Sequence, residues 1–371
     1  MAGNESLSAR NRTPADEFYT QLTDIEAELR HYRDQFRGKV VFCNCDDPYE
    51  SSFFKFFAMN FNHLGIKKLI TTTYAGSPIA GEQLPLFDLA GLRRARPPRE
   101  PYMVEITEVP DLNHDGATDL SDVEYLLRND ANVLAPLDRD GDFRSPECVA
   151  LLDEADIVVT NPPFSLFREF ITLLLESGKH FLVLGDQNGS KYSSVFPHVM
   201  TNRLWFGYEN GGIKWFRVPD DYDIKTESRK RVVDGVKYFS MGRIYWYTNL
   251  DTTKRHQPLT LFKRYTPEEF PTYTNYPAIE VAKVAEIPLD YDGEMGVPIT
   301  FLDKYNPEQF RIVGISTQLA EPMSRYALKE DYMSPEGRVV GGTGKLFVPL
   351  GNGKHQGVYE RIIIRRIGAR T

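Results

Sequence analysis

Four consecutive residues combine hydrogen-bond acceptors with a flat ring: Asn161, Pro162, Pro163 and Phe164. The two prolines fix two φ angles and remove two backbone donors. The carbonyl of Pro162 and the side chain of Asn161 are therefore held in set directions beside an aromatic ring. Such a loop offers acceptors to an amino group and a face to a planar group. An exocyclic amine on a nucleobase meets both requirements, and this loop is our candidate catalytic site.

The residues around the loop predict the elements that position it. Residues 156–160 are a short apolar run that ends abruptly at Asn161, a pattern typical of a buried parallel strand. Further strands are predicted at 39–45, 68–74 and 180–186, an edge strand at 102–108, and helices at 13–37, 51–63 and 166–175. This alternation of strand and helix predicts a doubly wound α/β domain.

The length of 371 residues suggests two domains. Beyond about residue 250 helices become few, while Pro, Tyr, Asn and Asp are frequent, and residues 361–367 look like a strand. We expect a disordered N-terminus at 1–12, the α/β domain at 13–250 and a smaller, irregular domain at 251–371.

Polar groups follow three of the predicted strands at their carboxyl ends, which is where ligands bind in open α/β sheets. Asp46 and Asp47 follow the first strand, residues 72–74 follow the second, and residues 161–164 follow the strand at 156–160. A nucleoside cofactor requires a carboxylate for its ribose hydroxyls and a polar group for its adenine amine. These strand ends could supply both.

A further acid adjoins an aromatic ring at Asp142 and Phe143, which could contact the cofactor's adenine. Residues 44–48 contain no glycine, so the glycine-rich dinucleotide fingerprint is absent, which argues against a nicotinamide or flavin enzyme. Each residue also has an ordinary structural interpretation. Asp46 and Asp47 could cap helices, Phe143 could be a core ring, and Asn161 could form a turn.

Charge is distributed unevenly along the chain. The net charge of −8 by itself argues against a nucleic-acid partner. Residues 101–160 hold fifteen acidic and three basic side chains, however, whereas residues 211–264 hold twelve basic and six acidic ones. The second segment includes Lys225, Arg229, Lys230, Arg231, Lys254 and Arg255. It is compatible with binding a phosphate backbone, and equally with an unevenly charged solvated surface.

The composition also bears on location. No apolar run approaches the roughly 18 residues that a membrane span needs, and the N-terminus lacks the layout of a signal peptide. We therefore expect a cytoplasmic protein with no membrane partner. The three cysteines, Cys43, Cys45 and Cys148, are expected to be reduced packing residues rather than a disulfide or a zinc site.

An acidic insertion at about residues 109–130 has the spacing of a calcium loop. Positions 1, 3, 5, 9 and 12 of such a loop would be Asp111, Asn113, Asp115, Asp119 and Asp122, with Gly116 at position 6. The Asp at position 12 and the helix that follows resemble dockerin-type modules. The alternative is an acidic turn that binds no metal.

Several blocks carry a resemblance to a known family. Residues 156–164 resemble the catalytic motif of amino-group DNA methyltransferases that use S-adenosylmethionine. The EcoRI-type adenine-specific DNA methyltransferases are more closely similar, on residues 16–21, 43–48, 141–145, 161–169, 287–291 and 295–299. The likeness extends from about residue 16 to about 310. The chain departs from the common methyltransferase pattern in lacking its glycine-rich first motif.

The resemblance implies a role for each matching residue. Tyr19 and Thr20 would hold the methionine end of S-adenosylmethionine, Asp46 or Asp47 would lie near its amino or ribose groups, and Asp142 with Phe143 near its adenine. Asn161 and the Pro162 carbonyl would accept the two hydrogens of the target adenine's amine, and Phe164 would stack on the flipped base. The implied fold is a Rossmann-like methyltransferase sheet with a C-terminal target-recognition domain.

The resulting hypothesis is a site-specific adenine methyltransferase acting on double-stranded DNA, as an orphan enzyme or beside a cognate restriction endonuclease. A monomer is expected by analogy. One alternative is methylation of an amine in RNA or of an amide in protein, since the same loop would grip either group. Another is a catalytically silent DNA-binding relative, against which the intact residues 161–164 argue.

Overall fold

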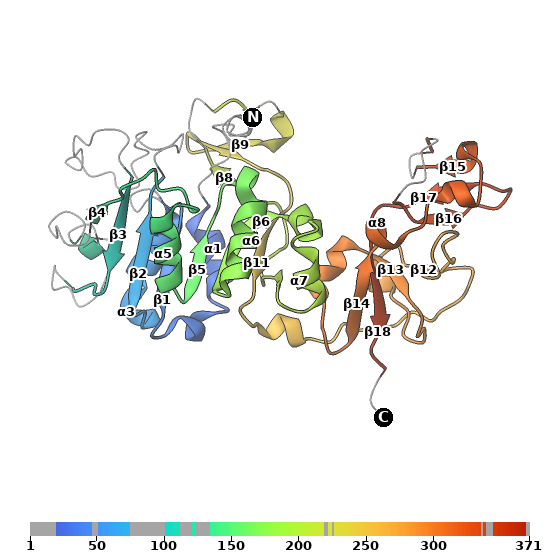
Figure 1. Ribbon diagram of the computed structural model, residues 1–371, viewed down its shortest axis with the longest axis horizontal. Helices are drawn as coiled ribbons and strands as arrows, with labels where there is room; N and C mark the ends of the chain where they lie inside the picture. The colour runs from blue at the N-terminus through green and yellow to red at the C-terminus, as the bar shows by residue number, and fades with distance from the viewer. Residues whose placement is uncertain are drawn as a thin grey trace, which may run out of the picture. The chain divides into compact units, whose positions relative to one another are not determined.

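The protein is described by a computed structural model covering residues 20–46, 51–74, 101–111, 121–123, 126, 134–218, 222–224, 226–334, 337–338 and 344–368. The chain divides into two compact units, shown in Figure 1. The first unit comprises residues 1–195 and 206–250, and the second comprises residues 196–205 and 251–371.

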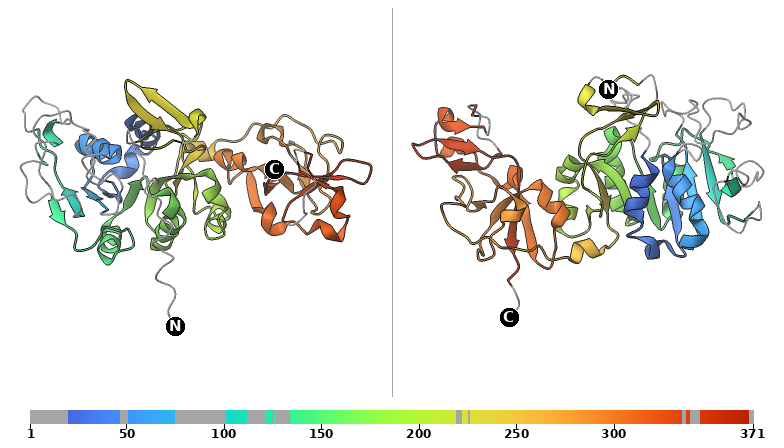
Figure 2. Two further views of the ribbon diagram at one scale, coloured as in Figure 1. Left: turned by 90° about the horizontal axis from the view of Figure 1, so that it is seen from above. Right: turned by 180° about the vertical axis from the view of Figure 1, so that it is seen from behind.

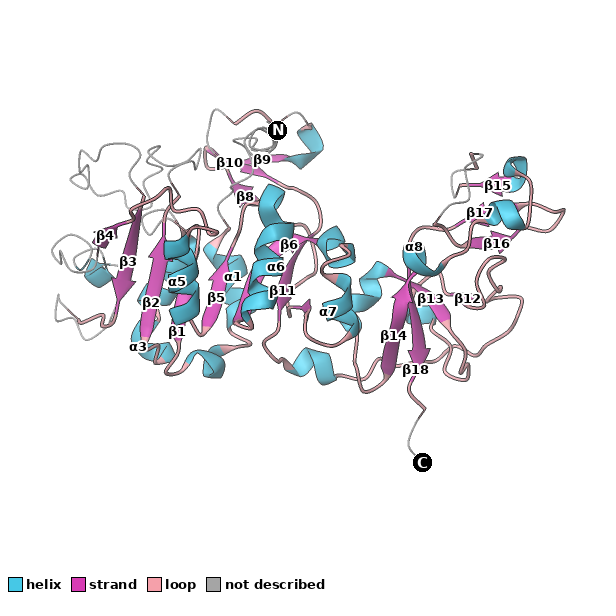
Figure 3. Cartoon of the chain, in the orientation of Figure 1, coloured by secondary structure: helices cyan, strands magenta, loops and turns pink. Residues whose placement is uncertain are grey.

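The first unit is built on an eight-stranded mixed sheet in the order β4-β3-β2-β1-β5-β6-β11-β7. These strands are β1 (Val40–Cys43), β2 (Lys68–Thr72), β3 (Tyr102–Ile106), β4 (Leu134–Pro136), β5 (Ile157–Thr160), β6 (His180–Asp186), β7 (Trp205–Phe206) and β11 (Ile244–Thr248). The neighbours β2, β1, β5 and β6 are parallel, so their carboxyl ends share one edge of the sheet. Figure 3 shows the strands side by side.

Helices cover both faces of this sheet (Figures 1 and 2). One face carries α1 (Leu22–Leu29) and α2 (Ser52–Met59), followed by the short α3 (Phe61–Leu64), and the other carries α5 (Pro146–Glu154) and α6 (Phe167–Ser177). Local sequence sets the helix ends. The Ser51 side chain accepts hydrogen bonds from the first turn of α2, and α6 ends where Gly178 adopts a left-handed φ of 69°.

Most predicted elements of the first unit are present, with two differences. The strand expected at the sheet edge, β3, pairs antiparallel with β2 and also with β4, so it is not an edge strand. The helix predicted at 13–37 is shorter in its described part, because α1 ends at Leu29 and only a 3-10 turn, η1 (Arg33–Phe36), follows it. Residues 13–19 of that predicted helix lie outside the described residues.

A smaller three-stranded sheet belongs to the same unit. It consists of β8 (Phe216–Arg217), β9 (Lys230–Val233) and β10 (Val236–Phe239), in the order β8-β10-β9 with all pairs antiparallel. The β9–β10 turn uses two left-handed residues, Asp234 at φ 50° and Gly235 at φ 78°. Figure 1 shows this sheet beyond the carboxyl ends of the parallel strands.

The second unit holds two further sheets. One has the order β12-β13-β18-β14 and the other β15-β17-β16. Their strands are β12 (Ile279–Glu280), β13 (Met295–Pro298), β14 (Phe310–Ile315), β15 (Tyr332–Met333), β16 (Phe347–Pro349), β17 (His355–Gly357) and β18 (Arg361–Arg366), with α7 (Phe196–Met200) and α8 (Ser316–Leu319) against β14. The strand predicted near the C-terminus is therefore confirmed as β18.

The structure shows the state of the cysteines and whether its helices could span a membrane. Within the described part of the chain, Cys43, Cys45 and Cys148 form no disulfide, and burial raises the pKa of Cys43 and Cys148 above that of an ordinary thiol. Both are therefore protonated packing residues rather than reactive thiolates. Within the described ranges, no helix combines the length and apolar character that a bilayer span requires.

Candidate active site

Three neighbouring parallel strands, β2, β1 and β5, end side by side at the predicted site. Threonine hydroxyls join these ends. Thr160 Oγ1, on β5, donates to the carbonyl of Asn44 beyond β1, and Thr72 Oγ1, on β2, donates to Asn44 Oδ1 at 2.9 Å. All three residues are buried. The strand end that carries Asn161 is thus fixed relative to the end that carries Asp46.

Asp46 lies directly beyond β1 and is 7% exposed. Its Oδ1 accepts a hydrogen bond of 2.8 Å from the hydroxyl of Ser51, the same residue that caps α2. Cys45 precedes it in a left-handed conformation with φ 65°, which turns the chain sharply at the strand end. Asp46 is therefore in place at the sheet edge, whereas Asp47 lies outside the described residues.

The Asn161–Phe164 loop follows β5 without a break. Asn161 is half-buried with its Oδ1 shielded from solvent, and Pro162 is buried. The carbonyl of Pro163 accepts from Leu166 N at 3.0 Å, which closes the 3-10 turn η2 (Phe164–Leu166). The half-buried Phe164 ring meets the Phe216 ring edge-on, with centroids 5.9 Å apart at 76°. The ring is therefore supported from one side.

Asp142 and Phe143 come to the same edge of the sheet but are engaged by protein groups. Phe143 is 2% exposed and packs edge-on against Phe170 of α6, with ring centroids 5.0 Å apart. The carboxylate of Asp142 is held by the Arg144 guanidinium through contacts of 2.7 and 2.8 Å. Phe143 thus has the contacts of a core ring, while Asp142 is fixed in direction.

The segment before them needs glycine at one position. Gly141 has φ 74°, and a Cβ placed there would lie 2.0 Å from the carbonyl oxygen of Thr73, which follows β2. Any side chain would therefore push residues 141–143 away from the end of β2. This close approach holds the Asp142 backbone against the edge where Asp46 and Asn161 lie.

Thr20 lies two positions before the first residue of α1 and is 4% exposed. Its Oγ1 is buried and has no hydrogen-bond partner within the described part of the chain. A buried hydroxyl of this kind fits contact with a polar ligand, because leaving it unsatisfied costs about 1–3 kcal/mol. The neighbouring Gln21 donates through Nε2 to the Trp215 carbonyl at 2.6 Å, next to Phe216. Tyr19 lies outside the described residues.

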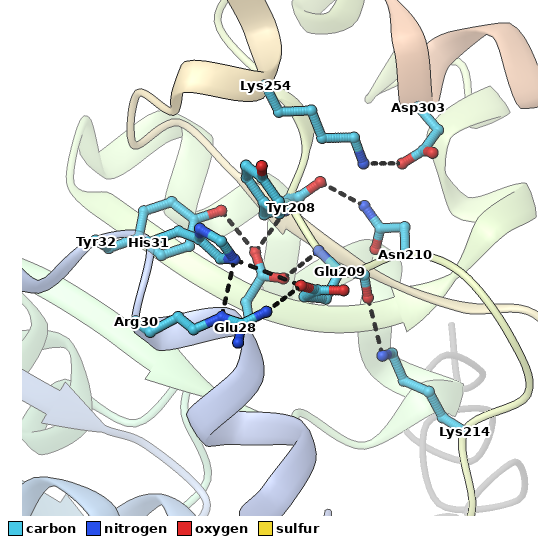
Figure 4. Close-up of polar contacts among 11 residues, drawn as sticks. Glu28, Arg30, His31, Tyr32, Tyr208, Glu209, Asn210, Lys214, Lys254 and Asp303 are labelled. Atoms are coloured by element: carbon cyan, nitrogen blue, oxygen red, sulfur yellow. Dashed lines mark hydrogen bonds and ion pairs between the residues drawn. The ribbon is translucent and has the colours of Figure 1, made fainter.

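A buried carboxylate on α1 holds the segment of residues 207–216, which ends at Phe216 (Figure 4). Glu28 is fully buried and accepts from Tyr208 N at 2.7 Å, Glu209 N at 2.6 Å and Tyr32 Oη at 2.6 Å. Burial raises the pKa of Glu28, and the three hydrogen bonds oppose that shift. Outside this contact, the His31 ring stacks on Tyr208 with centroids 3.5 Å apart.

Gln21, Glu28 and Phe216 are site residues that the sequence interpretation missed. A signal existed for Glu28, because it shares a helical face with Ile25 and Tyr32, which are buried. A carboxylate within an apolar stripe indicates a buried partner. Gln21 and Phe216 gave no comparable signal. Gln21 contacts a residue 194 positions away, and Phe216 of β8 contacts Phe164 of η2, far from it in the sequence.

Five of the six basic residues singled out in 211–264 are described, and they fall into two groups. Arg229, Lys230 and Arg231 are exposed at or beside β9, and Lys225 lies outside the described residues. The other group is occupied within the second unit. Lys254 pairs with Asp303 at 2.7 Å, and the Arg255 guanidinium lies 3.7 Å from the Trp205 ring centroid. Burial lowers the pKa of Arg255. In the first group Lys230 pairs with Glu227 at 3.5 Å and the Arg231 guanidinium lies 5.9 Å from the Trp215 ring centroid, while all three side chains stay exposed.

The predicted calcium loop is described only at its ends. Asp111 is half-buried and Asp122 is 1% exposed, while Asn113, Asp115 and Asp119 lie outside the described residues. Where the structure describes side chains, no group of three or more His, Cys, Asp or Glu residues is arranged to hold a metal ion. Calcium binding therefore stays a prediction.

The fold and the candidate site together define a class of enzyme. A large mixed α/β sheet whose parallel strand β5 ends in Asn-Pro-Pro-Phe, with acceptors and an aromatic ring at that end, is consistent with the fold of methyltransferases that modify amino groups.

Comparison with known proteins gives the family. Residues 6–367 match the model described as adenine-specific methyltransferase EcoRI, and the chain belongs to this family. It is 40% identical over 315 residues to the Type II methyltransferase M.EcoRI of Escherichia coli, covering 84% of this chain and 89% of the relative. It is 36% identical over 314 residues to the Type II methyltransferase M.MpnI of Mycoplasma pneumoniae, covering 84% of each. No solved structure is significantly similar.

The resemblance inferred from the sequence motifs is therefore confirmed. The protein is an enzyme, an adenine-specific DNA methyltransferase of the restriction-modification type.

Proposed function

We propose that the protein transfers the methyl group of S-adenosylmethionine to the N6 amine of a flipped adenine within a specific site of double-stranded DNA. The observation that carries this proposal is the Asn161–Phe164 loop, held at the carboxyl end of β5 by the threonine contacts and supported by Phe216. The four parallel strands would form the core of a Rossmann-like methyltransferase sheet.

The loop residues have separate roles in this proposal. Asn161 Oδ1 and the carbonyl of Pro162 accept the two hydrogens of the adenine amine. The lone pair of that amine is delocalised into the ring, and two acceptors favour tetrahedral geometry at nitrogen, which frees the lone pair for in-line attack. Phe164 stacks on the extruded base, and Phe216 holds the Phe164 ring in place.

S-adenosylmethionine supplies an electrophilic methyl group on a sulfonium. The buried Thr20 hydroxyl fits a role in holding its methionine end, together with Tyr19, and Asp46 or Asp47 binds its amino or ribose groups. Asp142 lies at the adenine end. Phe143 contributes there by shaping the pocket wall, because its ring is occupied by Phe170.

The remaining assignments follow from the family. Residues 251–371 would recognise the target sequence, and residues 13–250 would carry catalysis. The protein would act as a cytoplasmic monomer, either as an orphan enzyme or beside a cognate restriction endonuclease to which it need not bind. Methylation of RNA or of a protein amide is the competing function.

Sequencing of modified bases tests the function directly. DNA from cells that express the chain is expected to carry N6-methyladenine at one position of one sequence motif, and DNA from cells expressing Asn161→Ala is expected to lack it. If DNA is unmodified in both kinds of cell and new methyl groups appear in RNA or protein only in cells that express the wild-type chain, the substrate is RNA or protein rather than DNA.

The exposed cations beside β9 give a prediction about DNA affinity. Lys230→Gln with Arg231→Gln is expected to reduce the slope of log Kd against log salt by about 2, since each lost phosphate contact lowers it by about 0.9. Fluorescence anisotropy of labelled DNA across a salt series measures this slope. The variant should keep its turnover rate at saturating DNA, because neither side chain contacts the Asn161–Phe164 loop in the described structure.

A matched pair of cations serves as the control. Arg33 and Lys67 are exposed near the amino ends of β1 and β2, at the opposite edge of the sheet from Asn161. Arg33→Gln with Lys67→Gln makes the same change in net charge and is expected to leave the slope within about 0.5 of wild type. Equal slopes for the two double variants would remove β9 from the DNA-binding surface.

The calcium loop also has a direct test. We expect isothermal titration of Ca²⁺ into the wild-type protein to give saturable heat that disappears in the Asp111→Ala, Asp115→Ala variant, because both carboxylates would be ligands. Methyl transfer should be the same in both proteins, as the ion would be structural. Equal heat in the two titrations, or no heat in either, would show that this loop is an acidic turn that binds no calcium.

A further inference from the structure

Ile213 is an apolar side chain in an unusual position. Among the described residues of the first unit, two large apolar side chains are exposed, and Ile213 is the more exposed of them at 64%, against 56% for Val232. Gly211 and Gly212 precede it, and a Cβ built on either glycine would meet no atom within 4 Å. Ile213 thus stands at an open tip of the segment 207–216, where another molecule could approach the backbone closely.

The chain leading to this tip is held firmly. Glu28 accepts from Tyr208 N and Glu209 N, as Figure 4 shows. Asn210 is 3% exposed and is bound on both sides of its amide, since its Nδ2 donates to the Gly207 carbonyl and its Oδ1 accepts from Trp246 N, each at 2.7 Å. The polar groups before the tip are therefore fixed by buried hydrogen bonds.

The chain leaving the tip is fixed as well. Lys214 is 6% exposed, and its ammonium group turns back to the Glu209 carbonyl at 3.0 Å. The next carbonyl, of Trp215, accepts from Gln21 at 2.6 Å. An exposed apolar residue is commonplace in a mobile loop, but here a short, open tip is clamped on both sides, so Ile213 is presented in one place.

The tip is close along the chain to Phe216, the residue that contacts the Asn161–Phe164 loop. Phe216 lies three positions after Ile213, and an extended chain covers about 10 Å over three positions. Phe216 in turn contacts Phe164, the ring assigned to stack on the flipped adenine. Ile213 is therefore within about 10 Å of the backbone that supports the base-binding ring.

We propose that Ile213 is a wedge that enters the base stack of DNA when the target adenine is extruded; this inference rests on the proposed function and deepens it. Extruding a base costs unstacking and unpairing free energy and leaves a gap in the duplex. Apolar side chains that insert at base steps compensate such unstacking in other DNA-binding proteins. Ile213 has the required chemistry, exposure and fixed position, and it is a positioning residue that acts on the DNA rather than on the reacting atoms.

Ile213→Ala tests the wedge in the full-length protein. The assay contains S-adenosylmethionine and unmodified duplex DNA with the sequence motif that the enzyme methylates. With 2-aminopurine in place of the target adenine, the fluorescence increase on binding is expected to be much smaller for the variant than for wild type. At saturating DNA, turnover on the normal target is expected to fall about tenfold. Ile213→Leu should retain most of both signals, since it keeps the apolar bulk.

A mismatched target separates the wedge from a general structural role. A mismatched adenine is already poorly stacked, so its extrusion costs less. Ile213→Ala is therefore expected to recover to within about twofold of wild type on a duplex whose target adenine is mismatched. The control Leu151→Ala truncates a half-buried side chain on α5 and should behave like wild type on both duplexes.

The outcomes distinguish the wedge from the proposed function. Wild-type turnover on matched DNA with no loss in Ile213→Ala overturns the wedge and leaves the function standing. A loss of the same size on matched and mismatched targets also overturns it, because that pattern indicates damage to the fold or to the catalytic loop. Failure of the wild-type protein itself to methylate DNA would instead overturn the proposed function.

Discussion

Asn161→Ala is expected to lower methyl transfer to adenine at least about 10³-fold while leaving DNA affinity within about twofold of wild type. The loss follows from removing one of two acceptors that act on the amine only as its nitrogen becomes tetrahedral, and single groups of this kind are worth about 10²–10³ in turnover. The additional loss comes from the loop itself, because Asn161 joins β5 directly to Pro162.

Single-turnover methylation of saturating DNA and a separate anisotropy titration measure the two quantities. Asn161→Asp keeps an acceptor oxygen at the same position, so its loss should be smaller than that of Asn161→Ala. A fully active Asn161→Ala enzyme would refute the assigned role. Equal losses of turnover and of DNA affinity would show that the side chain organises the binding surface rather than the reaction.

Glu28→Ala is expected to destabilise the protein by about 3–5 kcal/mol, because it leaves three buried donors without their acceptor, each worth about 1–3 kcal/mol before water relaxes into the cavity. Those donors are the backbone N–H groups of Tyr208 and Glu209 and the hydroxyl of Tyr32. Urea unfolding, followed at the first transition, measures the loss as a lower midpoint.

The same helix supplies the control. Glu26 is exposed on α1, and Glu26→Ala is expected to change the free energy of unfolding by less than about 0.5 kcal/mol. Glu28→Gln keeps one acceptor and should fall between the two. Should Glu28→Ala and Glu26→Ala unfold at the same urea concentration, the Glu28 contacts would have no net effect on stability, and the segment 207–216 would be held by other means.

The central strands of the first unit are predictable from sequence for a physical reason. Strands buried on both faces are almost uniformly apolar and stop at polar residues, so β1, β5 and β6 are marked at both ends. The edge of the sheet is harder to predict. β3 alternates as an edge strand would, yet β4, which covers it, is only three residues long and gives no periodic signal.

The Asn161–Phe164 loop can be singled out as a candidate from sequence, because its residues are consecutive and their chemistry is local. The surroundings of that loop cannot. The support of Phe164 by Phe216 and the clamp of Glu28 on residues 208 and 209 depend on chain segments that pairing of helices and sheets brings together. For Phe143, the sequence motif predicts which part of the candidate site it lies in. Only the structure shows that its ring already packs against Phe170.

The division of the chain has a consequence for how such enzymes can exchange parts. Residues 196–205, including α7, belong to the second unit, although the chain afterwards returns to the first unit for residues 206–250. Phe196 and Val199 of α7 are buried, and α7 packs against β14. A chain shortened to residues 251–371 would lack this helix and expose the face that it covers. The second unit is therefore encoded by two separate gene segments. Recombination between relatives would have to transfer both segments together to move this unit intact.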